Sequence, residues 1–246
     1  MTTTLCIDVG GTGLKAALVS LDGEMVSERV KIKTPYPCPP DTLVKNLLKL
    51  SEGIGDYDRI SVGFPGLVRG GIVSNVPALS RATYDGDPDP GLLSQWRGFD
   101  LGHALHDAFD KPLRLANDAD VQGSAVIEGK GFEFVMTLGT GIGTAVFQDG
   151  MLIPHLELSH ALYRTGMDFD QAIGNAARKR IGNTRWRSRV LKAITIFDEF
   201  LFFDTCHIGG GNAARIADME LPDRCRIVSN TAGLLGGVRL WDHTAS

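Results

Sequence analysis

The sequence lacks the cysteine spacing of a disulfide framework or of a zinc site. Its 246 residues include four cysteines, and no two of them form a Cys-x-x-Cys pair. Cys6 and Cys206 lie inside apolar, strand-like runs, which is typical of buried, reduced thiols. We therefore expect a cytoplasmic protein without structural disulfides.

Long apolar runs are also missing. Nowhere do eighteen apolar residues follow one another, which is about the length that spans a membrane. The opening MTTTLCID has no basic residue and no long apolar core, so it does not resemble a secretion signal. The sequence predicts neither membrane association nor secretion.

There is no strong excess of charge of one sign. The net charge is -4 and the pI is about 5.9, which argues against a surface devoted to nucleic acid or to anionic membranes. Any basic site must therefore be local. At 246 residues the chain is long enough for one large domain or two modest ones, and 43% hydrophobic residues are enough to form their cores.

The first pattern that is present is a glycine turn between two strands. Leu5 to Val9 is an apolar strand, Gly10-Gly11-Thr12-Gly13 is a turn, and Lys15 to Ser20 is the returning strand, with Met25 to Lys33 expected as a third antiparallel strand. The glycines let backbone N–H groups approach an anion, while Thr12 and Lys15 add a hydroxyl and a positive charge. A tight hairpin without a ligand is an equal alternative, because the spacing matches neither of the two common nucleotide loops.

An apolar strand also runs directly into polar residues between Leu115 and Asp120. An aspartate at the end of a buried strand is held rigidly in a partly dry place, which suits a general base, and Asp118 is the candidate. Asn117 and Asp118 also fit ordinary helix caps. Taken alone, this segment favours the cap.

The opening pattern occurs a second time. Phe132 to Leu138 is a strand, Gly139 to Gly143 is a glycine turn, and Thr144 to Phe147 returns. Two such units in one chain suggest two related halves, each offering a turn to a shared anion.

Two further segments leave alternatives open. The polar loop from Ser80 to Gly98 carries Trp96, which either borders a ligand cleft or covers the core. The stretch from Arg178 to Lys192 holds seven basic residues and no acid. It fits a polyanion site, a solvated basic face or a nucleotide or nucleic-acid contact, in which Trp186 stacks on a base or packs inward.

Together these motifs resemble the actin-like ATPase fold. Asp8 to Gly13 and Thr137 to Thr144 look like its two phosphate motifs, and Gly209-Gly210-Gly211-Asn212 resembles its nucleotide-side glycine motif. Other segments are similar to the sugar-side motifs of the ROK family of sugar kinases: Asn75-Val76-Pro77, Asn117-Asp118-Ala119 and Glu157-Leu158-Ser159-His160. Within that family the chain looks most like the polyphosphate glucokinases, and the similarity covers nearly the whole chain.

The resemblance implies an α/β fold of the two-domain actin-like ATPase (ribonuclease H-like) type. Each half would be a mixed sheet flanked by helices. We expect an N-terminal domain over residues 1–115 and a C-terminal domain over 116–246, with a last helix at about 233–243 packing back on the first domain.

The resemblance also implies a sugar kinase that phosphorylates the 6-hydroxyl of glucose. Asp118 would accept the hydroxyl proton, and Asp8 would organise Mg²⁺ through water. The sugar would be held by Asn75, Asn117, Asp118, Glu157 and His160. The phosphoryl donor would be held by Gly10, Gly11, Thr12, Gly13, Lys15, Gly139, Thr140, Gly141, Gly209, Gly210, Gly211 and Asn212.

The implied partners are glucose or a related hexose, a donor that is polyphosphate or ATP, and a second copy of the chain in a homodimer. No nucleic-acid partner is expected. No cysteine occurs between His160 and Cys206, so we expect no zinc site of the kind that many ROK kinases carry. Ser159 stands where the family usually has glycine, which leaves glucose against mannose open.

Two alternatives from other classes remain. A ROK-type sugar sensor without turnover would place a DNA-binding segment before the first phosphate motif, but here Asp8 comes at position eight. A filament-forming scaffold of the actin type would not need the sugar-side set of Asn117, Asp118, Glu157 and His160.

Overall fold

Two apolar runs that are distant in sequence pair in parallel at the centre of the first sheet. In the computed structural model, which describes residues 2–228 and 232–242, these runs are β1 and β4. The sheet order is β3-β2-β1-β4-β7, with antiparallel pairing from β1 to β3 and parallel pairing from β1 to β7. The strands are β1 (Thr3–Val9), β2 (Gly13–Ser20), β3 (Val30–Lys33), β4 (Arg59–Phe64) and β7 (Leu113–Asn117).

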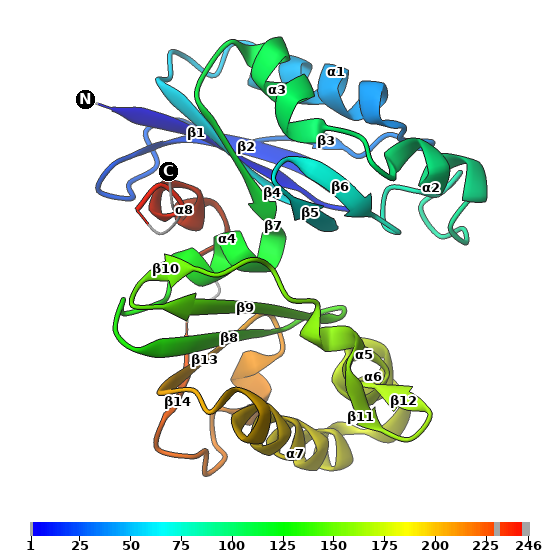
Figure 1. Cartoon of the computed structure of the whole chain (residues 1–246), viewed down its shortest axis with the longest axis vertical. Helices are drawn as coiled ribbons and strands as arrows, with labels where there is room; N and C mark the ends of the chain where they lie inside the picture. The colour runs from blue at the N-terminus through cyan, green and yellow to red at the C-terminus, as the bar shows by residue number, and fades with distance from the viewer. Residues whose placement is uncertain (1, 229–231, 243–246) are drawn as a thin grey trace. The chain divides into compact units, whose positions relative to one another are not determined.

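Two helices cover one face of this sheet (Figure 1). They are α1 (Pro40–Ser51) and α3 (Leu101–Phe109), whose leucines at helical spacing enter the core. A short ladder, β5 (Leu67–Arg69) with β6 (Ile72–Asn75), and helix α2 (Pro90–Trp96) complete this side. Trp96 is fully buried and its indole Nε1–H donates to the Cys38 carbonyl oxygen at 2.9 Å, so it covers the core and does not border a cleft.

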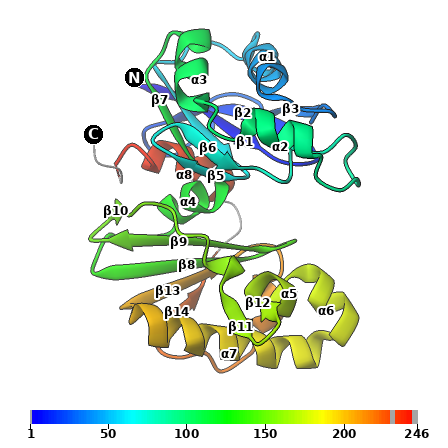
Figure 2. The same ribbon diagram turned by 45° about the vertical axis from the view of Figure 1, so that its right-hand side comes forward.

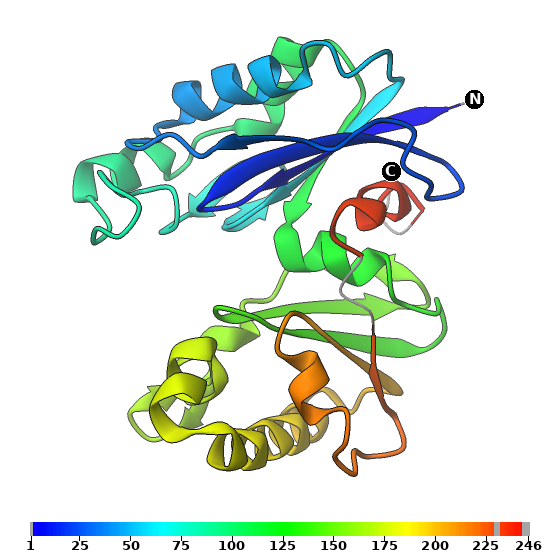
Figure 3. The same cartoon turned by 180° about the vertical axis from the view of Figure 1, so that it is seen from behind.

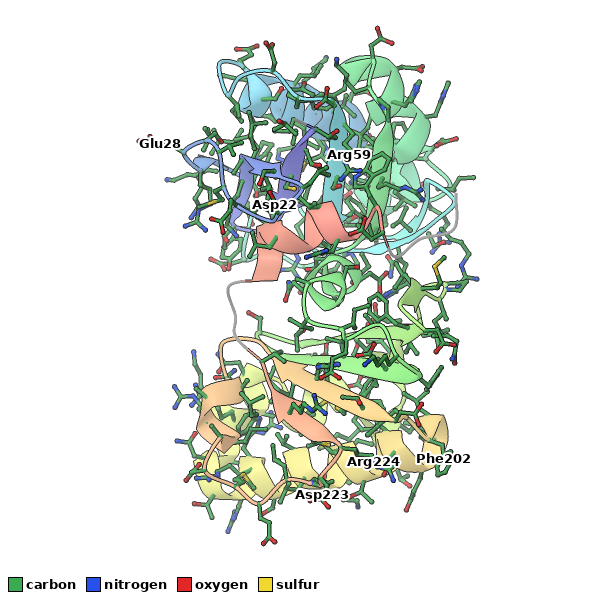
Figure 4. The ribbon with its side chains drawn as sticks, turned by 90° about the vertical axis from the view of Figure 1, so that its left-hand side faces the viewer. Asp22, Glu28, Arg59, Phe202, Asp223 and Arg224 are labelled. Atoms are coloured by element: carbon green, nitrogen blue, oxygen red, sulfur yellow. The ribbon has the colours of Figure 1, made fainter. Side chains whose placement is uncertain are left out.

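The opposite face of the sheet is covered by α8 (Ala232–Arg239), seen from behind in Figure 3. The indole Nε1–H of Trp241, just beyond the helix, donates to Ser61 Oγ at 2.8 Å, and Ser61 donates to the Gly237 carbonyl oxygen at 2.5 Å. Arg59 lies over the Trp241 ring at 4.7 Å and stands beside this helix in Figure 4. Val238 packs with Cys6 and Val19 on the same face.

The second unit has a sheet of the same kind (Figure 2). Its order is β10-β9-β8-β13-β14, again with an antiparallel hairpin and parallel neighbours. The strands are β8 (Phe132–Leu138), β9 (Ile142–Gln148), β10 (Met151–Leu152), β13 (Thr205–Gly209) and β14 (Cys225–Ile227). The expected mixed sheet flanked by helices is thus confirmed for both halves.

Helices of the second unit pack on the face that carries Phe134 and Cys206. They are α5 (Phe169–Ile173), α6 (Asn175–Ile181) and α7 (Asn183–Leu201), with the ladder of β11 (Leu162–Arg164) and β12 (Met167–Asp168) and the 3-10 turns η1 (Leu158–His160) and η2 (Ala213–Ile216) beside them. Trp186 of α7 is fully buried, and its indole Nε1–H donates to the Ile173 carbonyl oxygen. It therefore packs inward and offers no surface for a base.

Compact units divide the chain at Ala125, with Gly233–Asp242 returning to the first unit. The boundary expected between residues 115 and 116 falls inside β7, whose pairing with β4 keeps it in the first unit. The helix after it, α4 (Asp118–Ser124), also belongs there.

The apolar residues after Asp120 predict a helix to about Glu128, but α4 ends at Ser124. The buried carboxylate of Glu133 accepts hydrogen bonds from the backbone N–H groups of Glu128 and Gly129 at 2.8 and 2.6 Å. His207 Nε2 lies 2.6 Å from the same carboxylate. These bonds hold the backbone in a turn and replace the bonds that a longer helix would make.

Two other elements are shorter than expected. The third strand begins at Val30 because Met25 makes only an isolated bridge with Val19. After the glycine motif the sequence predicts a helix from Ala213 to Met219, but the structure has only the 3-10 turn η2 there. Within the described residues no helix has both the length and the apolar character needed to cross a membrane, and the four cysteines, all described, are free.

The close approach of α8 to α4 predicts the effect of one methyl group. A Cβ on Gly236 would lie 1.7 Å from the Val121 carbonyl oxygen, a contact that forces backbone movement. We expect Gly236→Ala to lower the free energy of unfolding by about 1–3 kcal/mol, although alanine favours helix over glycine. Chemical denaturation measures this.

Gly211→Ala is the matched control, because nothing lies within 4 Å of its added Cβ. We expect its free energy of unfolding to stay within about 0.5 kcal/mol of wild type. Equal stability of the two variants would contradict the packing of α8 against α4.

Candidate active site

The carboxyl ends of β1, β4 and β7 place the candidate residues of the first unit at one edge of the sheet. In the parallel register, Asp8 pairs with Gly63, Gly63 pairs with Ala116, and Phe64 pairs with Asn117. Asp8 and Asp118 therefore both lie at the edge where open α/β sheets bind their ligands. The first glycine turn, which follows β1, lies at the same edge.

Asp8 and Lys15 face each other across the first glycine turn. They are paired residues of β1 and β2, and their side chains form an ion pair with 2.7 Å between Lys15 Nζ and Asp8 Oδ2. Each side chain keeps about a third of its surface exposed, at 34% and 30%. An ammonium and a carboxylate are thus both available beside the turn.

The turn itself is closed by a hydrogen bond from the Gly10 N–H to the Gly13 carbonyl oxygen at 3.1 Å. Two side chains that sequence reasoning missed bind its carbonyls. Thr34 Oγ1 donates to the Gly10 oxygen at 2.5 Å, and the Tyr36 hydroxyl donates to the Gly11 oxygen at 2.7 Å. No local pattern marks these residues, since the contacts span 24 and 25 positions.

Asn117 and Asp118 stand at the junction of β7 and α4. The Asn117 Oδ1 accepts from the Ala119 N–H at 2.8 Å, so Asn117 is the helix cap, and its Nδ2 donates to the Gly66 carbonyl oxygen at 3.1 Å. Asp118 is the first helical residue and is half-buried. The helix N-terminus favours a negative charge there.

Gly66 connects this junction to Asn75. A Cβ on Gly66 would lie 2.5 Å from the Asn75 carbonyl oxygen, so only glycine allows β6 to end so close. The first unit thereby brings Asn75, Asn117 and Asp118 together. The Pro65-Gly66 pair after a buried strand was the sequence signal for this turn, but it did not indicate the role.

The second glycine turn is held by residues from three different segments. Asp170 Oδ1 accepts from the Ile142 N–H at 2.6 Å, and the Asn175 N–H donates to the Thr140 carbonyl oxygen at 3.1 Å. The Asn212 Nδ2 donates to the Gly139 oxygen at 3.3 Å. Burial raises the pKa of Asp170, while the Ile142 N–H opposes this rise.

The segment Gly209 to Asn212 lies against the end of β8. Gly210 has a φ of +87°, and a Cβ there would lie 2.6 Å from the backbone of Leu138, so the position requires glycine. The Asn212 N–H donates to the Leu138 carbonyl oxygen at 2.9 Å. The structure thus brings this motif and the Gly139 to Gly143 turn together within the second unit.

Glu157 directly precedes the 3-10 turn η1, and His160 is its last residue. Ser159 Oγ donates to Glu157 Oε1 at 2.5 Å, and His155 Nε2 lies 3.6 Å from Glu157 Oε2. The Ser159 hydroxyl thus orients the Glu157 carboxylate. His160 is exposed. The turn η1 contacts α5, which carries Asp170, and β9, which follows the second glycine turn.

The described side chains offer few ligands for a metal ion by themselves. Among the residues that the structure describes, no group of three His, Cys, Asp or Glu side chains is placed to hold a metal ion. Asp8 offers one partly exposed carboxylate, which suits Mg²⁺, because that ion keeps water and substrate phosphates as its other ligands.

Comparison with protein families decides where the chain belongs. The model of the ROK family matches residues 4–155. The chain belongs to the ROK family. This confirms the resemblance, and the fold is accordingly the actin-like ATPase fold of ROK sugar kinases.

Individual ROK relatives extend the likeness to nearly the whole chain. Polyphosphate glucokinase of Mycobacterium tuberculosis is 29% identical over 94% of this chain and 88% of its own. Among solved structures, the inorganic polyphosphate/ATP-glucomannokinase of Arthrobacter sp. strain KM is 26% identical, covers 99% of this chain and 100% of that one, and has a TM-score of 0.77. A ROK glucokinase of Streptomyces griseus with bound glucose and AMPPNP shares the fold at 16% identity, with a TM-score of 0.71 over 97% of this chain and 98% of that one.

The environment of Glu157 predicts a pH effect on stability. Burial raises its pKa, but the nearby His155 imidazole, the hydrogen bond from Ser159 and the charge of His155 outweigh burial, so the pKa lies below its usual value. The ionised form therefore stabilises the fold above the unfolded pKa of about 4.3, and this is lost as pH falls through the folded pKa. We expect Glu157→Gln to weaken the rise of unfolding free energy between about pH 3 and pH 5, measured by urea denaturation.

Asp170→Asn supplies the control with the opposite sign. Because burial raises the pKa of Asp170, its ionisation opposes folding, and its removal should steepen the same rise. A Glu157→Gln protein with the wild-type pH dependence would disprove the assigned environment.

Proposed function

We propose that this ROK-family chain is a sugar kinase that transfers a phosphoryl group to the 6-hydroxyl of glucose. The observation that carries the proposal is the parallel register that brings Asp8, the first glycine turn, Asn117 and Asp118 to one sheet edge. Similarity to polyphosphate glucokinases over 94% of the chain supports the same reaction. A glycine turn for phosphate beside a carboxylate for a hydroxyl proton is what phosphoryl transfer requires.

In the proposed mechanism Asp118 accepts the proton of the sugar hydroxyl as the hydroxyl oxygen bonds to the transferred phosphorus. The bond from that phosphorus to the bridging oxygen of the donor breaks, and the shortened polyphosphate, or ADP, leaves. Its position at the start of α4 is rigid, because Asn117 caps the helix and is tied to Gly66. Lys15 supplies positive charge to the phosphoryl group beside the glycine turn. Asn75, Asn117, Glu157 and His160 would hold the sugar hydroxyls.

Mg²⁺ is part of the proposal, with Asp8 holding it through water. When bound, the ion would neutralise charge on the donor phosphates. Asp8 fits this role because its carboxylate is partly exposed and its present partner, Lys15, is itself a group that binds phosphate.

The proposed donor is inorganic polyphosphate, with ATP as the alternative. Helix α6 begins at Asn175, whose N–H binds the second glycine turn, and its last turn carries basic residues. A seven-residue helix is about 10 Å long, so these residues lie a short distance from the turn that would hold the transferred phosphoryl group. A donor longer than one phosphoryl unit could therefore reach them.

Some basic side chains of the stretch from Arg178 to Lys192 bind other protein groups, and others are exposed. Arg178 binds Asn175 and Asn183, Arg187 pairs with Asp218, and Arg189 donates to the Ala172 carbonyl oxygen. Lys179, Arg180 and Arg185 are exposed on either side of Gly182. We assign polyphosphate contact to these three side chains.

We further propose a cytoplasmic homodimer. The free cysteines fit a reducing compartment. Phe200 and Phe202, labelled in part in Figure 4, are 70% and 81% exposed at the end of α7, and large exposed aromatic side chains are typical of protein interfaces.

The catalytic assignment predicts a selective loss. Asp118→Asn keeps the shape and polarity of the side chain but cannot accept the proton, so turnover should fall by about 10²- to 10⁴-fold while glucose still binds. Glucose 6-phosphate formation measures turnover, and calorimetry measures glucose binding.

Asp110→Asn makes the same chemical change at the C-terminal cap of α3 and should keep wild-type turnover. Near-normal turnover in Asp118→Asn would overturn the assignment of the base. Wild-type protein that forms no product from either donor would favour the sugar-sensing alternative.

The proposed polyphosphate contact predicts a change in KM for long polyphosphate but not for ATP. The triple variant Lys179→Gln, Arg180→Gln, Arg185→Gln should raise KM for long polyphosphate about tenfold and reduce its dependence on salt, because fewer ion contacts form. KM for ATP should change little. Steady-state assays with both donors at several salt concentrations test this.

The control removes the same charge elsewhere. Lys45, Lys49 and Lys111 are exposed lysines of the first unit, and their triple change to glutamine should leave both KM values at the wild-type level. An equal effect of the two triple variants would show that only the overall charge matters.

A further inference from the structure

Peptide geometry links the held carbonyls of the first turn to its free N–H groups. A trans peptide is planar, and its C=O and N–H point in opposite directions. Holding the Gly10 and Gly11 oxygens therefore also fixes the N–H groups of Gly11 and Thr12, which belong to the same two peptides. Within the described residues, neither of these N–H groups has a hydrogen-bond partner.

The two donors that hold the carbonyls are well placed to act as fixed anchors. Thr34 is 7% exposed, and its hydroxyl lies 2.5 Å from the Gly10 oxygen. Burial raises the pKa of Tyr36, so its hydroxyl keeps its proton at neutral pH. A Cβ on Gly11 would lie 3.6 Å from the Tyr36 oxygen, which is an ordinary van der Waals distance.

The second turn shows the same arrangement with different donors. The Gly139 oxygen is held by the Asn212 side chain and the Thr140 oxygen by the Asn175 N–H. By the same geometry, the N–H groups of Thr140 and Gly141 are turned away from these anchors. Each unit thus holds two consecutive carbonyls of its glycine turn, which is what an anion cradle of backbone amides needs.

Tyr36 makes one contact that has no counterpart in the second turn. Its oxygen also lies 2.9 Å from the Ala78 carbonyl oxygen, three residues after Asn75 of the proposed sugar site. One hydroxyl proton is therefore shared between the glycine turn and the sugar-side segment. The edge-on ring of Tyr84, at 6.2 Å between centroids, supports the Tyr36 ring.

We propose that Thr34 and Tyr36 are positioning residues for the phosphoryl donor. They orient the peptides of the first turn so that the Gly11 and Thr12 N–H groups face the transferred phosphoryl group, and Tyr36 ties this turn to the segment that follows Asn75. The proposal rests on the proposed kinase function and adds two residues that do not themselves touch substrate.

Kinetics provide the first test. Tyr36→Phe removes only the oxygen, and Thr34→Val keeps the shape of the side chain. Each should raise the donor KM about tenfold, because a buried carbonyl loses its partner and the turn loses its orientation. The glucose KM should change less than about twofold in Thr34→Val and more in Tyr36→Phe, whose hydroxyl also contacts Ala78.

Two controls separate positioning from general stability. Thr34→Ser keeps the hydroxyl and should restore the wild-type donor KM. Tyr84→Phe changes a neighbouring tyrosine that is 50% exposed and should leave both KM values unchanged. An unchanged donor KM in both Tyr36→Phe and Thr34→Val would overturn the proposal.

Backbone amide NMR provides a test that does not need activity. On addition of tripolyphosphate with Mg²⁺, the Gly11 and Thr12 amide resonances of the wild-type protein should shift, and the shifts should shrink in Thr34→Val. Absence of wild-type shifts would overturn the inference even if glucose is phosphorylated. If the wild type makes no product but these amides shift as expected, the kinase proposal fails and the inference on the turn is supported.

Discussion

The parallel pairing of β1, β4 and β7 is the constraint on which the first unit depends. Parallel strands end at the same edge, so residues as distant as Asp8 and Asn117 are brought to one line by backbone hydrogen bonds alone. Each strand then ends in a different device: a glycine turn after β1, Pro65-Gly66 after β4 and a helix cap after β7. The candidate residues of this edge lie where the strands end: Asp8 is next to last in β1, and Asn117 is the last residue of β7.

The sequence predicted the elements whose pattern is local. Phe132 to Leu138 is a strand with the predicted bounds, and the similar run from Arg59 to Phe64 also forms a strand over its whole length. Continuous apolar runs bounded by turn residues leave few alternatives. The third strand and the helix after Asn212 came out shorter, because their extent depends on partners elsewhere: Met25 has only a bridge to Val19, and Asn212 is committed to the end of β8.

The candidate site divides in the same way. Glycine turns, Asp118 and Asn117 could be found because their residue types are unusual at strand ends. The residues that hold them could not, since Thr34, Tyr36 and Asp170 act on backbone groups 24 to 28 positions away, and nothing local distinguishes them from other polar residues. For Trp96 and Trp186 the sequence left a ligand contact and core packing both open, and both side chains pack into the core.

The junction of β7 and α4 shows why the cap and the catalytic interpretations of Asn117-Asp118 are compatible. The Asn117 side chain accepts a hydrogen bond from the Ala119 N–H and donates one to the Gly66 carbonyl oxygen. Asn117 is therefore the helix cap, and the Asp118 carboxylate beside it is not needed for that role. The glycine turns are held in a similar way: Thr34 and Tyr36 hold carbonyls of the first turn, and the Asn212 side chain and the Asn175 N–H hold carbonyls of the second. The N–H groups of the same peptides are the ones that we propose to face the phosphoryl donor. In both cases the structural role of one group orients its neighbour, so a residue that satisfies the fold is also what prepares the site.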